Sequence, residues 1–104
     1  MTLDDYQSAA ILTAIYPERR RVVYPTLGLV GEAGEVAEKI KKSLRGDAPF
    51  DREAVALELG DVLWYLAALA RDLDYTLNEI ATMNLEKLAS RKARDTLKGS
   101  GDSR

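Results

Sequence analysis

The chain contains neither cysteine nor histidine among its 104 residues. This absence excludes disulfide bonds, ordinary zinc sites, thiol catalysis and serine–histidine chemistry. Any metal ion must therefore be held by oxygen ligands, which favours magnesium, manganese or calcium.

Long hydrophobic runs are lacking as well. The longest, residues 62–70, is too short to span a bilayer, and the N-terminus has no resemblance to a signal peptide. The net charge of −2 gives no general attraction for nucleic acid or for an anionic membrane. We therefore expect a cytoplasmic protein that binds neither, in which a strongly anionic ligand needs a metal ion or a few well-placed cations.

Only three prolines and seven glycines occur, mostly between segments with helical periodicity, and no segment alternates like a β-strand. Thr2, Asp51 and Thr76 are suited to cap helix N-termini, and Gly46 is suited to end a helix. The pattern predicts four helices, over residues 3–15, 26–44, 52–72 and 76–94.

Four helices joined by short loops predict one all-α domain, residues 1–97, packed as a four-helix bundle. Helix 52–72 is apolar beyond its main stripe, for example at Trp64 and Tyr65, and such helices are usually buried on most sides. Since one bundle rarely buries that much of one helix, we expect an oligomer. Residues 98–104, rich in Gly, Ser and Asp, are expected to form a mobile tail unless a partner orders them.

A short pattern, acid-x-Gly-acid-Val, occurs in both central helices. It reads Glu-Ala-Gly-Glu-Val from residue 32 and Glu-Leu-Gly-Asp-Val from residue 58. At about 100° per residue, the two acids of each pair stand about 60° apart, at the edge of the apolar stripe. If the two apolar faces pack together, four carboxylates can converge at one rim of the core: Glu32, Glu35, Glu58 and Asp61.

Gathered carboxylates repel one another, and a divalent cation offsets that repulsion. Carboxylates on facing helices are a known way to form a metal site in a bundle. Gly34 and Gly60 each cost a helix about 1 kcal/mol relative to alanine, which close helix approach or room for a ligand would explain. The alternative, a solvated surface pair, is common for one pair but much less expected for two with matching context. Glu38, near Lys41 and Lys42, is expected to be a surface residue.

A polar trio, Asn84, Lys87 and Arg91, lies within about 60° on the last helix and continues an inward-facing apolar line. One interpretation is a phosphate clamp, with Lys and Arg as charged donors and Asn as a neutral donor. The alternative is a helix C-terminus that favours cations in any case. Together with the acid motifs, the clamp is the preferred interpretation.

Two further groups are weaker candidates. Arg19, Arg20 and Arg21 lie in a loop, where such residues are usually solvated, so contact with substrate is the minority interpretation. The aromatic residues are expected mostly in the core or at an interface, with one or two stacking on a base. Trp64 is the substrate-binding candidate among them.

Along nearly its whole length the chain resembles the MazG-like family of the all-α NTP pyrophosphohydrolase superfamily. The resemblance rests on GLVGEAGEVAEKIKK (residues 28–42), ELGDVLWYL (58–66), NLEKLASR (84–91) and DYQ (5–7). These motifs are specific to the superfamily but not to a substrate. Many relatives continue with Tyr-Pro after the position of Arg91, whereas this chain has Lys92-Ala93. Contacts made there in other members are therefore either absent or replaced by the tail.

The resemblance implies hydrolysis of a (d)NTP between the α- and β-phosphates, giving (d)NMP and pyrophosphate. It implies Mg²⁺, with Mn²⁺ as a substitute, at the four acids. It implies phosphate contacts from Lys87 and Arg91, with Asn84 near the phosphates or the sugar. It also implies a homodimer or homotetramer with the active site close to a subunit interface.

Glu35 is the candidate general base, because one acid held loosely by the metal can accept a proton from water. Two alternatives stay open. One is a helical interaction module without catalysis, and the other is an enzyme like phosphoribosyl-ATP pyrophosphohydrolase.

Overall fold

The computed structural model describes residues 1–104, and all of its regular structure is helical. The chain forms α1 (Leu3–Ile11), a short 3₁₀ turn η1 (Glu18–Arg20), α2 (Val23–Arg45), α3 (Arg52–Asp72) and α4 (Leu77–Ala93). The predicted all-α class is therefore confirmed. None of these helices has both the length and the apolar character needed to cross a bilayer.

The helix ends follow from capping residues that the sequence displays. The Thr2 side chain accepts from the Asp5 N–H while the Asp5 carboxylate accepts from the Thr2 N–H, and Thr76 and Glu79 repeat this reciprocal arrangement. Asp51 caps α3 by accepting from the Ala54 N–H at 3.1 Å. Gly46 ends α2 in the left-handed conformation, with φ of 80°, where glycine has no steric penalty.

Two helix boundaries differ from the prediction. The first helix ends at Ile11 rather than Ile15, because the chain tightens into three-residue turns in which the Thr13 N–H bonds to the Ala10 carbonyl. The second begins at Val23 rather than Thr26, so that Pro25 lies in its first turn. Proline is tolerated there because a first-turn N–H has no helical partner to lose.

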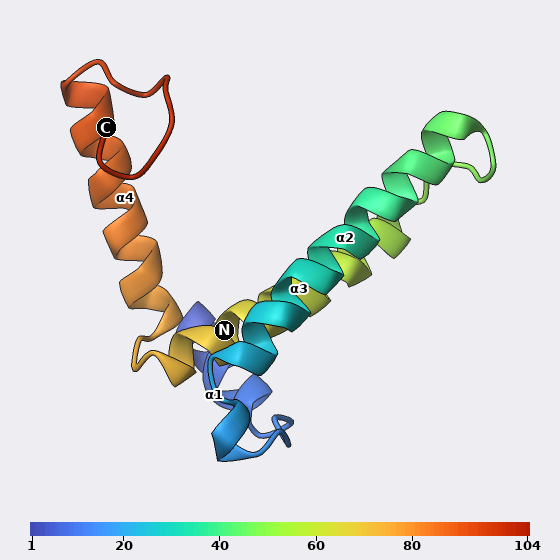
Figure 1. The fold of residues 1–104 in the computed structure, drawn as a ribbon, viewed down its shortest axis with the longest axis horizontal. Coiled ribbons are helices and arrows are strands. Elements are labelled where there is room, and N and C mark those ends of the chain that lie inside the picture. The colour runs from blue at the N-terminus through green and yellow to red at the C-terminus, as the bar shows by residue number, and fades with distance from the viewer.

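Helices α2 and α3 lie side by side as an antiparallel hairpin, and α1 packs against the end of the hairpin at which α4 begins (Figure 1). The small buried core lies at that end. Ala67 and Ala70 of α3 and Leu77 of α4 form it, and partly buried apolar side chains surround them: Tyr6, Leu63, Leu66 and Ile80. The alanines let the helices approach closely at this junction.

Helix α4 meets α1 and α3 only near its own start. The buried Gln7 side chain donates to the carbonyls of Ala67 and Tyr75, both at 3.1 Å, and accepts from the Leu77 N–H at 3.0 Å. Beyond this junction α4 points away from the α2–α3 hairpin (Figure 1). One chain therefore does not close the predicted four-helix bundle, because the hydrogen bonds that hold the α3–α4 turn direct α4 outwards.

The residues after α4 fold back against its end (Figure 1). The Arg94 guanidinium donates to the Arg104 carbonyl at 2.6 Å, and the Arg104 Nε donates to the Thr96 carbonyl at 3.2 Å. Gly99 and Gly101 have positive φ angles of 121° and 83°, which suit glycine in a tight return. The mobility of residues 98–104 stays a prediction.

Candidate functional site

Three acidic side chains meet where α2 faces α3. Glu32 comes from α2, and Glu58 and Asp61 come from α3; one carboxylate oxygen of each lies within 4.8 Å of the others. Glu32 and Glu58 are half-buried, and Asp61 is exposed. The structure thus brings together three of the four acids that the repeated motif singled out.

Burial and the neighbouring acids both disfavour the ionised form of Glu32. Partial burial, a hydrogen bond with Glu58 and the negative charges of Asp61, Glu58 and Glu35 raise its pKa above the ordinary glutamate value. The only cation in an ion pair with the cluster is Lys39, whose Nζ lies 3.8 Å from Glu58 Oε1. A set of closely spaced oxygen donors with excess negative charge suits a hard divalent cation such as Mg²⁺.

Glu35 does not join this group. It lies one turn further along α2 with an exposed side chain. Its charge nevertheless contributes to the raised pKa of Glu32, so it stands near the rim of the cluster. Its roles as a metal ligand and as a general base stay predictions.

A cavity of about 340 Å³ opens beside the acids. Its lining includes Glu32, Asp61, Trp64, Tyr65 and Thr13. The indole Nε1 of Trp64 donates to Thr13 Oγ1 at 2.7 Å, which holds the ring at the cavity. The structure therefore places Trp64, the aromatic candidate, next to the acids. Thr13 was missed, because nothing in the sequence distinguishes this residue beyond the end of α1.

The glycines near the acids differ in what surrounds them. A side-chain carbon at Gly28 would overlap the ring of Tyr65, so this glycine is needed for Tyr65 to lie across α2. A side-chain carbon at Gly34 or Gly60 would meet nothing within 4 Å. Close approach of another helix within the same chain therefore does not explain these two glycines, whereas room for a ligand beside the acids stays a prediction.

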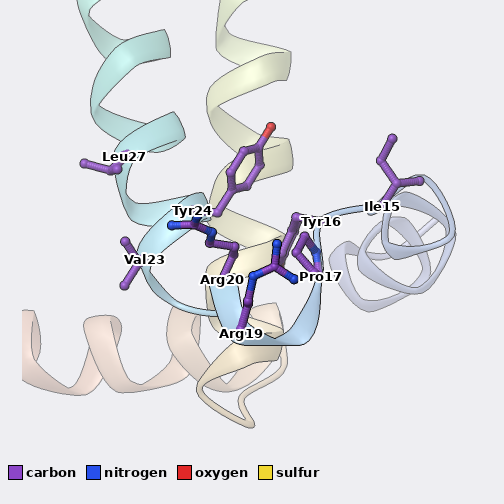
Figure 2. Close-up of a pocket in the computed structure, with 8 residues that line it drawn as sticks. All are labelled: Ile15, Tyr16, Pro17, Arg19, Arg20, Val23, Tyr24 and Leu27. Atoms are coloured by element: carbon purple, nitrogen blue, oxygen red, sulfur yellow. The ribbon is translucent and has the colours of Figure 1, made fainter.

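Aromatic side chains connect the acid cluster to a second pocket. The rings of Tyr16 and Tyr24 stack at 4.9 Å, Tyr24 lies 6.1 Å from Tyr65, and Tyr65 packs edge-on against Trp64 at 5.0 Å. Figure 2 shows the second pocket, about 380 Å³ in volume, around η1 and the start of α2. Its lining comprises Ile15, Tyr16, Pro17, Arg19, Arg20, Val23, Tyr24 and Leu27.

The third arginine of this loop has a structural partner. Asp72, whose side chain has no exposed surface, accepts from Arg21 Nε at 3.1 Å, from the Tyr16 hydroxyl at 2.8 Å and from the Val22 N–H at 2.8 Å. Val22 has a φ of 67°, which is strained for a β-branched residue. Asp72 therefore fixes the turn that begins α2. Sequence reasoning missed this role because Asp72 looked only like the last residue of a helix.

The polar trio of α4 is not at the acid cluster within one chain. Lys87 and Arg91 instead contact Asp102 of the C-terminal tail, at 2.8 Å and 3.1 Å. Asn84 is exposed. Because α4 points away from the hairpin, the trio and the acids lie on different arms of the molecule (Figure 1).

The fold and the site define a class: a small all-α protein that presents carboxylates from two antiparallel helices beside an aromatic cavity. The chain belongs to the MazG nucleotide pyrophosphohydrolase domain family, whose model matches residues 25–94. That segment contains both acid motifs and the α4 trio.

The chain is 47% identical, over an alignment of 114 positions that covers all of both chains, to the Gene 37 protein of Mycobacterium phage L5. No solved structure matches the chain.

Proposed function

We propose that this protein is a Mg²⁺-dependent nucleoside triphosphate pyrophosphohydrolase that converts a (d)NTP and water into a (d)NMP and pyrophosphate. One observation carries the proposal: in a chain of this family, Glu32, Glu58 and Asp61 present oxygens within 4.8 Å of one another between α2 and α3. Triphosphate hydrolysis depends mainly on positioning and charge neutralisation, which a hard cation held by carboxylates supplies.

The acids present fit magnesium. All three carry carboxylate oxygens that can ligate a metal, and all three lie on helices. Their negative charges repel one another, and a bound divalent cation would offset that repulsion. Glu35 adds a fourth carboxylate at the rim. When bound, Mg²⁺ (or Mn²⁺ in its place) would hold the triphosphate and offset the charge that develops at the reacting phosphorus.

The proton that leaves the attacking water requires an acceptor. Glu35 is exposed, stands near the other acids and takes this role in our proposal. The water oxygen bonds to one phosphorus of the α–β anhydride and the P–O bond from that phosphorus to the bridging oxygen breaks, so that the (d)NMP and pyrophosphate separate. Trp64, fixed at the cavity by Thr13, offers a face on which a base can stack.

We further propose that the phosphate contacts come from a second copy of the chain. Lys87, Arg91 and Asn84 lie on an arm that does not reach the acids of its own chain. Only seven of the 104 residues are buried, and large apolar side chains such as Leu57 and Leu85 are exposed. A homodimer or homotetramer would cover these side chains and bring α4 of one copy to the acids of another.

The test is a pyrophosphate-release screen across canonical and damaged (d)NTPs, with phosphoribosyl-ATP included. We expect release from at least one (d)NTP in Mg²⁺ and none after chelation. Activity confined to phosphoribosyl-ATP would favour the alternative enzyme class.

Thermal unfolding separates the remaining alternative. A metal site predicts that Mg²⁺ raises the melting temperature, because the ion binds the folded state. A helical interaction module without catalysis would show neither this rise nor pyrophosphate release, and that pair of results would overturn the proposal.

A further inference from the structure

The tail beyond α4 ends on the two cations that the proposed function assigns to phosphates. Asp102 Oδ1 accepts from Lys87 Nζ at 2.8 Å and from Arg91 Nη2 at 3.1 Å. The two cations hold the pKa of Asp102 below the ordinary aspartate value. A carboxylate held between Lys and Arg occupies the same kind of position that a phosphate oxygen takes.

The fit of the tail to Arg91 is incomplete. Arg91 is only 5% exposed, and its Nη2 also faces the carbonyls of Gly101 and Asp102 at 3.4 Å and 3.3 Å. Its Nε is buried and has no hydrogen-bond partner. A buried donor without a partner is unfavourable, and a guanidinium prefers to bind an anion through two parallel N–H groups. Nε and Nη2 are such a pair, so Arg91 lacks an acceptor that a phosphate would supply.

The tail is also short, and hydrogen bonds from its last residue hold it in a loop. Arg104 donates to the carbonyls of Thr96, Gly101 and Leu97, and its own carbonyl accepts from Arg94. The short tail therefore holds Asp102 close to the two cations, but the Asp102 side chain is 84% exposed, and ion pairs that involve an exposed side chain are weak in water. A ligand with more negative charge than one carboxylate can therefore displace Asp102 from the two cations.

We propose that residues 97–104 form an autoinhibitory strap, in which Asp102 occupies the Lys87–Arg91 pair until a polyphosphate displaces it. This proposal rests on the assignment of the pair to phosphates. A polyphosphate replaces one carboxylate contact with several oxygens and can satisfy the Arg91 Nε. The apparent affinity for polyphosphate is then reduced by the fraction of molecules in which the strap is closed.

The experiment measures binding of inorganic pyrophosphate by calorimetry, at fixed Mg²⁺ and ionic strength, to the full chain and to two variants. Asp102→Asn removes the strap's charge from the cations. Asp95→Asn is the matched control, since Asp95 lies two residues before the strap, makes no side-chain contact with the cations and has a positive φ that asparagine tolerates. We expect Asp102→Asn to bind pyrophosphate about three- to tenfold more tightly and Asp95→Asn to match the wild type.

A second readout follows the strap itself. We expect the backbone amide signals of residues 99–104 to narrow on titration of the wild type with pyrophosphate, as the strap is released. Equal affinities for Asp102→Asn and the wild type, or equal gains in both variants, would overturn the strap. Failure of every variant to bind pyrophosphate would overturn it as well.

Failure of the proposed function looks different. In that case no variant hydrolyses a (d)NTP, while the affinity difference between Asp102→Asn and Asp95→Asn persists. If hydrolysis occurs with equal KM in all three proteins, the strap fails and the enzyme assignment stands.

Discussion

At the scale of single residues, the carboxylates of the acid cluster repel one another. Glu32 carries a raised pKa because partial burial, Glu58 and the neighbouring negative charges disfavour its ionised form. Removing one charge relieves the repulsion but also removes an oxygen ligand. The two effects have opposite signs, so the presence or absence of Mg²⁺ distinguishes them.

We predict that Glu32→Gln raises the melting temperature relative to the wild type in chelator and abolishes the rise that Mg²⁺ causes in the wild type. Pyrophosphate release falls about 100-fold or more, since even changes to groups that only support metal ligands cost 10–100-fold. The measurements are thermal unfolding with and without Mg²⁺ and steady-state turnover. Glu53→Gln, an exposed acid in the first turn of α3, is the control and should leave both unchanged. A Glu32→Gln protein that keeps the Mg²⁺ response would contradict the metal site.

Asp72 is a residue whose ionisation stabilises the fold. Burial alone raises its pKa, but hydrogen bonds from Val22, Tyr16, Arg21 and Arg71 outweigh that effect and hold the pKa below the ordinary value. A carboxyl group with a lowered pKa in the folded state stabilises that state above its unfolded pKa of about 3.9. The contribution is lost as pH falls through the folded-state pKa.

We predict that Asp72→Asn lowers the free energy of unfolding by about 2 kcal/mol near pH 7. The difference from the wild type should shrink as pH falls below about 4, where Asp72 of the unfolded chain takes up a proton, and it should be lost below the lowered folded-state pKa, where the folded protein is protonated as well. Urea unfolding of both proteins, from about pH 7 to below about pH 4, measures the difference in the free energy of unfolding. Asp74→Asn, at an exposed position in the adjacent turn, should change stability by less than about 0.5 kcal/mol. A difference between Asp72→Asn and the wild type that is constant with pH would contradict the proposed role of the charge.

At the scale of helices, the sequence predicted a helix end correctly where interactions between residues close in the chain determine that end. Thr2, Asp51, Thr76 and Gly46 cap helices as predicted, because each acts through backbone groups a few residues away. The start of α2 was misplaced, because the strained Val22 turn depends on Asp72, fifty residues later. A contact of that range leaves no local pattern to read.

The candidate site shows the same division. Helical spacing placed Glu32 beside its apolar stripe, and the packing of α2 on α3 then joined it to Glu58 and Asp61. Spacing alone gave Glu35 equal standing, but the cluster does not include it. The tail contact of Lys87 and Arg91 could not be foreseen, because a Gly-rich segment specifies no return path.

At the scale of the whole molecule, one chain is incomplete. The sequence indicated four amphipathic helices, and the rule that such helices close into a bundle predicted a core that one chain does not form. Gln7 fixes the α3–α4 junction, and α4 leaves its apolar side chains, such as Leu85, exposed. Another copy of the chain is the partner we propose for them.

The proposed sharing of a site between copies predicts complementation. Glu58→Gln and Arg91→Ala should each be nearly inactive alone. When the two are unfolded together and refolded as mixed dimers, about a quarter of the wild-type specific activity should return. Half of the dimers are then mixed, and each mixed dimer has one intact site. Refolding each variant separately before mixing is the control. No recovery in verified mixed oligomers would mean that the acids and the cations do not work across copies.

The most direct test of the central claim is the product of the reaction. Incubated with a (d)NTP and Mg²⁺, and followed by phosphorus NMR, the wild-type protein should yield (d)NMP and pyrophosphate in equal amounts. Glu58→Gln should yield neither, and the wild type in chelator should yield neither. Turnover that is unaffected by chelation and by Glu58→Gln, or no cleavage of any (d)NTP by the wild type, would contradict the claim that Glu32, Glu58 and Asp61 hold the catalytic ion.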